Sequence, residues 1–181
     1  MKTKFVAVFA ILAFALTGCK NEKPIDDLKV VTPEVVDKTF KVTLKVVVKK
    51  DDDIALFSTE DGSLNFTEEP IWLGIKGSDS EQDMVFTLPE GSFPTLFRID
   101  FGVKKDQEDI IWKSIKFEYA GKTREIQGAQ LATYFRPDDS KCSFDATTGL
   151  IKAVVKDGQR QIPSIYPLEN MLPAEIEKLA K

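Results

Sequence analysis

Residues 40–49 read Phe-Lys-Val-Thr-Leu-Lys-Val-Val-Val-Lys, and this stretch decides the fold class of the 181-residue chain. Apolar residues at even positions alternate with mostly polar residues at odd positions. A period of two, with many β-branched side chains, is typical of a strand that buries one face. The acidic run Asp51–Asp53 follows at once and predicts a turn.

Similar short runs continue along the chain, separated by turn residues. The expected strands cover residues 54–59, 63–66, 71–76, 83–88, 95–103, 109–119, 122–126, 150–156 and 159–165. Asp157-Gly158 predicts a tight hairpin turn. A helical turn is expected at residues 129–134 and a helix at 173–180, with Pro173 in its first turn. The chain is therefore predicted to be all-β, an antiparallel β-sandwich with a short C-terminal helix.

Composition excludes several function classes. The net charge of −4 argues against a nucleic-acid partner. The chain has no histidine, which removes the commonest general base and zinc ligand. It also lacks a Gly-x-Ser-x-Gly motif and a Walker loop. We expect no enzyme, although a glycosidase needs only two carboxylates and the acidic content leaves that option open.

The first 19 residues predict the cellular localisation. Lys2 and Lys4 precede a 12-residue apolar run at 5–16, which is too short to cross a bilayer. The following Leu16-Thr17-Gly18-Cys19 resembles a bacterial lipobox. That resemblance implies cleavage before Cys19 and lipidation of its thiol, with acyl chains as a membrane anchor. The expected organisation is a signal peptide at 1–18, a lipidated tether at 19–38 and a β-sandwich domain at 39–181.

The residues after Cys19 refine this expectation. Lys20 stands where aspartate is associated with inner-membrane retention, so the resemblance to lipoproteins implies the outer membrane. The Lys-Asn-Glu-Lys start at 20–23 is similar to the surface-export signals of Bacteroidota lipoproteins. Both a surface-exposed and a periplasm-facing position stay open. With Cys19 acylated, Cys142 has no disulfide partner and is expected to be a buried free thiol.

A second resemblance concerns residues 92–126. Leu-Phe-Arg-Ile-Asp-Phe-Gly at 96–102, followed by Ile111, Ile115 and Phe117, resembles a strand pair of jelly-roll modules of the galactose-binding and carbohydrate-binding-module type. This resemblance implies a jelly-roll sandwich and a glycan ligand. It supports the fold more than any ligand, because such sandwiches have many unrelated functions.

Two tryptophans suggest a ligand site. Alternation places Trp72 and Trp112 on the polar faces of their strands, away from the isoleucines. If residues 95–103 and 109–119 form a hairpin, Asp100 lies opposite Trp112 and Arg98 lies opposite Ser114. A planar ring beside an acid and an arginine is suited to a sugar. Alternatively, the tryptophans form a secondary core and Arg98–Asp100 is an ordinary ion pair.

Residues 134–139, Tyr-Phe-Arg-Pro-Asp-Asp, are a second candidate, with Tyr134 and Arg136 as ligand contacts. The alternative is an apolar plug that closes the sandwich. We expect no cofactor, but a structural calcium ion stays open, because acids cluster at 51–53, 79–83 and 138–139. None of these clusters has the spacing of an EF-hand loop.

Three functions follow from these patterns. The first is a glycan-binding lipoprotein in the outer membrane, with Trp72 and Trp112 exposed. The second is a structural or adaptor lipoprotein that docks on another envelope protein through an apolar patch. The third is an enzyme with two converging carboxylates. The exposure of the tryptophans separates the first two.

Overall fold

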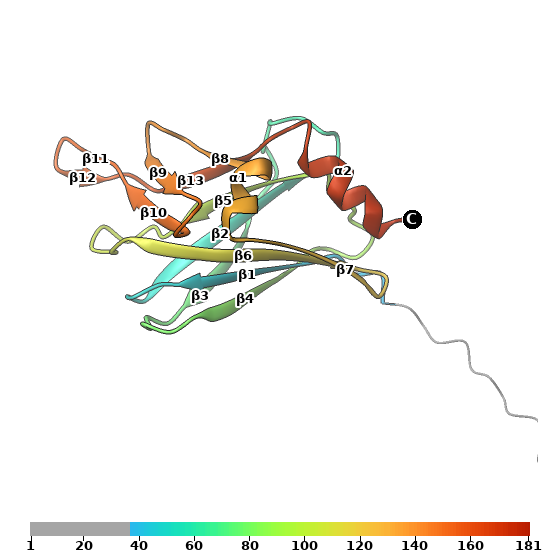
Figure 1. The fold of residues 1–181 in the computed structure, drawn as a ribbon, viewed down its shortest axis with the longest axis horizontal. Helices are drawn as coiled ribbons and strands as arrows, with labels where there is room; N and C mark the ends of the chain where they lie inside the picture. Colours follow the sequence, from blue (N-terminus) through green and yellow to red (C-terminus); the bar gives the residue numbers. More distant parts are fainter. Residues whose placement is uncertain (1–36) are drawn as a thin grey trace, which may run out of the picture. The chain divides into compact units, whose positions relative to one another are not determined.

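A computed structural model of the protein describes residues 37–181 (Figure 1). The predicted signal peptide, Cys19 and nearly all of the predicted tether lie outside the described residues. Within the described part, two antiparallel sheets form a sandwich, which confirms the all-β prediction. The buried apolar core is contributed by residues 40–179, so the sandwich contains its own core. No helix of the described part is long and apolar enough to cross a membrane.

The first sheet has six strands. In spatial order they are β4 (Gln82–Thr87), β1 (Lys41–Val47), β6 (Ile110–Tyr119), β10 (Leu150–Ala153) and β9 (Cys142–Asp145), and β7 (Lys122–Gln127) also pairs with β6. The opening stretch forms β1 as expected. Val42, Leu44 and Val46 are fully buried, whereas Lys41 and Lys45 point away from the core.

The second sheet has five strands and carries the candidate site. Its order is β3 (Ile71–Ile75), β2 (Asp52–Thr59), β5 (Leu96–Phe101), β13 (Ser164–Pro167) and β8 (Phe135–Pro137). A small separate hairpin joins β11 (Val155–Lys156) to β12 (Gln159–Arg160). Its turn has positive φ at Asp157 (52°) and Gly158 (72°), which confirms the predicted hairpin turn.

Aromatic residues join the two sheets. Phe97 of β5 and Phe117 of β6 stack with ring centroids 5.4 Å apart, and Phe40 lies within 6.3 Å of both rings. All three side chains are fully buried. Offset or stacked aromatic pairs of this kind contribute packing energy beyond the area they bury.

Short helices lie between and after the strands. The 3₁₀ turn Gly128–Gln130 leads into α1 (Leu131–Tyr134), and α2 (Leu172–Ile176) continues as the 3₁₀ turn Glu177–Leu179. Glu175 of α2 binds three groups: Arg124 Nε at 2.7 Å, the Tyr134 hydroxyl at 3.1 Å and Lys178 Nζ at 2.7 Å. The predicted C-terminal helix is therefore confirmed, and one carboxylate attaches it to β7 and α1.

Several expectations about the strands are wrong. Residues 63–66 form a loop and not a strand, and residues 161–163 interrupt the strand expected at 159–165. More important, β5 and β6 are consecutive in the chain but do not form a hairpin. β5 pairs with β2 and β13, whereas β6 pairs with β1, β7 and β10 in the other sheet. Gly102, at φ 71°, begins the connection that crosses between the sheets.

Candidate functional site

The outer face of the five-stranded sheet carries the more exposed of the two tryptophans. Trp72 lies on the edge strand β3, and 51% of its surface is exposed. It pairs with Ala55 of β2, which pairs on its other side with Asp100 of β5. These three residues form one row on the side away from the core. The outward orientation predicted for Trp72 is confirmed.

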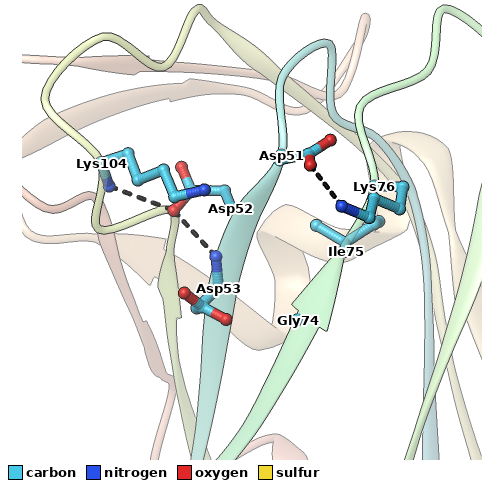
Figure 2. A pocket seen from close by; sticks show the side chains of 7 residues that line it. All are labelled: Asp51, Asp52, Asp53, Gly74, Ile75, Lys76 and Lys104. Carbon is cyan, nitrogen blue, oxygen red and sulfur yellow. Dashed lines mark hydrogen bonds and ion pairs between the residues drawn. The ribbon is translucent and has the colours of Figure 1, made fainter.

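A hollow of about 320 Å3 lies between the adjoining ends of β2 and β3 and begins at Gly74, two residues after Trp72 on the same face of β3. Figure 2 shows the residues that line it: Asp51, Asp52, Asp53, Gly74, Ile75, Lys76 and Lys104. Asp53 pairs directly with Gly74 and shares the outer face with Ala55 and Trp72. A Cβ at position 74 would lie 3.2 Å from Asp53 Oδ1, so glycine gives this carboxylate room.

Two charged side chains of the hollow make no hydrogen bond or ion pair within residues 37–181. They are the carboxylate of Asp53 and the ammonium of Lys104. A carboxylate accepts hydrogen bonds and an ammonium donates them. The hollow therefore offers an acceptor and a donor, and the ring of Trp72 adds an apolar surface on the same outer face, diagonally across the β2–β3 pair from Asp53.

Asp52 fixes the backbone beneath these two side chains. It is 2% exposed, and its Oδ1 accepts from the backbone N–H groups of Asp53 (2.8 Å), Val103 (2.8 Å) and Lys104 (3.1 Å). Its Oδ2 accepts from Gln107 Nε2 at 2.9 Å. Figure 2 shows Asp53 and Lys104 both attached to this one carboxylate. A buried carboxylate with four donors is a fixed structural element.

The third acid of the run has a different role again. Asp51 accepts from Lys76 Nζ at 2.6 Å and from the backbone N–H of Gly77 at 2.9 Å. These contacts hold the pKa of Asp51 below its ordinary value, and the same ion pair raises the pKa of Lys76. The acids at 51–53 therefore do not converge on one point. Within residues 37–181 no group of three or more acidic or cysteine side chains is placed to hold a metal ion.

Arg98 and Asp100 lie on the same outer face but bind each other. Arg98 Nε and Nη2 donate to the two carboxylate oxygens of Asp100, both at 3.1 Å. The guanidinium carbon lies 3.6 Å from the centre of the Phe57 ring, and the rings of Phe66 and Tyr166 are within 5.6 Å. Only 17% and 14% of the two charged side chains are exposed. This cluster is chiefly a packed support for the sheet.

The predicted outward orientation of Trp112 is wrong. Its side chain is fully buried and packs against Phe101, Phe135 and Phe144, with ring centroids 5.1–5.6 Å away. Its Nε1 donates to the carbonyl of Ser114 at 2.9 Å. The predicted opposition of Asp100 and Trp112 is also wrong, because the two residues belong to different sheets.

A β-bulge explains the orientation of Trp112. Lys45 of β1 pairs with Ser114, but the next residue, Val46, pairs with Trp112. Lys113 is therefore the extra residue, and the inward positions change parity there. Trp112 faces inward before the bulge and Ile115 faces inward after it. Strict alternation along the whole strand assigned Trp112 to the wrong face.

Tyr134 and Arg136, the second predicted pair of ligand contacts, lie in different surroundings. Tyr134 is buried in the core, where its hydroxyl binds Glu175, so its predicted ligand role is wrong. Arg136 is exposed on the edge strand β8, with its guanidinium carbon 5.5 Å from the centre of the Tyr166 ring. Four of the six predicted ligand contacts thus share the outer face of the five-stranded sheet: Trp72, Arg98, Asp100 and Arg136.

Sequence reasoning missed Asp53, Gly74 and Lys104 as a group. A signal for Asp53 existed, because alternation from the buried Ile54 places it on the outer face. For Lys104 there was none, since its position depends on the connection between the two sheets. Comparisons with protein families, curated proteins and solved structures found no match for this chain.

Proposed function

We propose that the sandwich is a non-catalytic glycan-binding module of a membrane-anchored lipoprotein. The observation that carries the proposal is the half-exposed ring of Trp72 on the same outer face as the unpaired carboxylate of Asp53, with the unpaired ammonium of Lys104 in the adjoining hollow. A pyranose ring presents C–H groups on one face and hydroxyls at its rim. The indole is suited to the first, and the two charged groups are suited to the second.

The shape of the site supports binding and not turnover. The hollow is open and shallow at the edge of a sheet, whereas catalytic sites exclude water around the reacting atoms. The acids that line it are separated in function, with Asp52 buried under backbone N–H groups and Asp51 held by Lys76. The contacts of these two acids favour a structural role.

The anchor is the part of the proposal that depends on the lipobox. Acylated Cys19 would hold the module at the outer membrane, on either face of that membrane. Residues 20–36 would separate the module from the membrane. A docking role on another envelope protein is the second candidate function. The exposed apolar ring of Trp72, on the edge strand β3, favours it.

A glycan array with residues 37–181 tests the proposal. We expect the wild-type module to bind at least one glycan class, and Trp72→Ala to lose roughly 1–3 kcal/mol of binding free energy. Trp72→Phe should retain part of the affinity, because it keeps a ring. Val85→Ala is the matched control, since it removes an exposed apolar side chain from the other sheet. Equal glycan binding by wild type and Trp72→Ala would overturn the proposed site, and no glycan binding at all would leave the docking function.

A further inference from the structure

The edge strand β3 lacks the features that protect the other edges of the sandwich. Exposed edges are usually protected by charged residues or prolines, which discourage pairing with another strand. The other edge strands of the two large sheets contain such residues: Asp83 in β4, Lys122 and Arg124 in β7, Arg136 and Pro137 in β8, and Asp145 in β9. β3 reads Ile-Trp-Leu-Gly-Ile and contains none. Within residues 37–181 its backbone pairs only with β2.

We infer that β3 pairs antiparallel with β3 of a second copy, about a two-fold axis at Leu73. In this register Trp72 of each copy lies opposite Gly74 of the other, and Ile71 lies opposite Ile75. A tryptophan beside a cross-strand glycine covers the backbone that the glycine leaves bare. The five-residue strand is therefore complementary to itself, and the two five-stranded sheets become one continuous sheet.

The charges that flank β3 favour a second copy of the chain as the partner of its free edge. Glu68 and Glu69 precede the strand, and Lys76 follows it. All three are exposed, and the Lys76 side chain is 88% exposed. Antiparallel self-pairing brings the acidic residues before β3 of each copy beside Lys76 of the other. The two-fold axis repeats this contact, so the interface contains it twice. Lys76 already binds Asp51, but an ammonium has three N–H donors and can bind a second carboxylate.

The interface is small. Two five-residue strands bury less than the 1,200 Å2 or so that is typical of stable complexes, so the pair is transient. We expect a dissociation constant between about 10 µM and 1 mM for the free module. Self-pairing does not depend on glycan binding.

Sedimentation velocity of residues 37–181, from micromolar to millimolar concentration, tests the inference. We expect a monomer–dimer equilibrium that Lys76→Glu and Glu69→Lys each weaken by about tenfold, because each replaces two attractions by repulsions. The double variant should restore association, because the exchanged charges again attract. Lys122→Glu is the matched control, since it makes the same charge change at an exposed site in the other sheet.

Three results would overturn the inference. They are a monomer at every concentration, association that survives both single variants, and a double variant that stays as weak as the single ones. Circular dichroism of each variant confirms that the fold is intact. Because the experiment contains no glycan, its failure leaves the proposed function untouched.

Discussion

Replacing Asp52 by asparagine removes one of the four hydrogen bonds of a buried carboxylate. The new amide nitrogen would face Gln107 Nε2, which is itself a donor and lies 2.9 Å from Oδ2 in the wild type. Gln107 cannot turn its amide freely. Its Nε2 also donates to the carbonyl of Lys50 at 2.9 Å, and its Oε1 accepts from the N–H of Glu108 at 3.0 Å. Two donors are therefore left facing each other.

The magnitude follows from the number of donors. A hydrogen bond to a charged group contributes about 1.5–3 kcal/mol and one to a neutral group about 0.5–1.5 kcal/mol. Asp52→Asn loses one charge-assisted bond and weakens the three at Oδ1, so we expect a destabilisation of at least about 3 kcal/mol. Asp52→Ala leaves all four donors without their acceptor, and a loss of at least about 4 kcal/mol is expected.

Urea denaturation of residues 37–181 measures these losses. Asp53→Asn is the matched control, because the next carboxylate along the chain makes no hydrogen bond within the described residues. It should change the free energy of unfolding by no more than about 0.5 kcal/mol. If Asp52→Asn were as stable as the wild type, or if Asp53→Asn cost as much as Asp52→Asn, the assigned role of Asp52 would be refuted.

Three further predictions follow from burial and charge. Trp112→Ala should reduce the free energy of unfolding by about 3–5 kcal/mol, and a thermal melt close to the wild type would contradict its burial. Glu175 is desolvated, which raises its pKa, but Lys178, Arg124 and Tyr134 together hold its pKa below the ordinary 4.5. Its stabilisation is therefore full above pH 4.5 and is lost as the pH falls below it; in acid titrations of the urea midpoint, Glu175→Gln should lose less stability than the wild type. Cys19→Ser should move the full chain from membranes to the soluble fraction, and continued membrane association would refute lipidation.

Local patterns predicted most of the strands but not their partners. The alternation in β1 and the Asp157-Gly158 turn depend on nearest neighbours, and both were predicted correctly. The partner of β5 depends on tertiary contacts. Asp52 accepts from backbone N–H groups of the segment after β5, some fifty residues away along the chain, and this contact holds the crossing to the other sheet. No local pattern distinguishes such a crossing from a hairpin loop.

The candidate site shows the same limit. Trp72 lies on a regular five-residue strand, so alternation placed it correctly. Trp112 lies just before a bulge, which an apolar-polar pattern does not reveal because Lys113 and Ser114 are both polar. Lys104 reaches the hollow only because the two sheets are connected there. Predicting a site from sequence is therefore most dependable within one uninterrupted strand.

The adjacent acids Asp52 and Asp53 have different roles: Asp52 stabilises the fold, and Asp53 is the proposed ligand contact. On a strand, consecutive side chains point to opposite faces, so Asp52 enters the interior while Asp53 stays at the hollow. The same Oδ1 of Asp52 holds the backbone of Asp53 and of Lys104, so the backbone from which both side chains extend is fixed before a ligand arrives. A fixed backbone loses less conformational entropy on binding. An Asp52 variant that still folds should therefore bind glycan more weakly, although residue 52 makes no contact with the glycan. Asp53→Asn, by contrast, should weaken glycan binding and leave the free energy of unfolding unchanged.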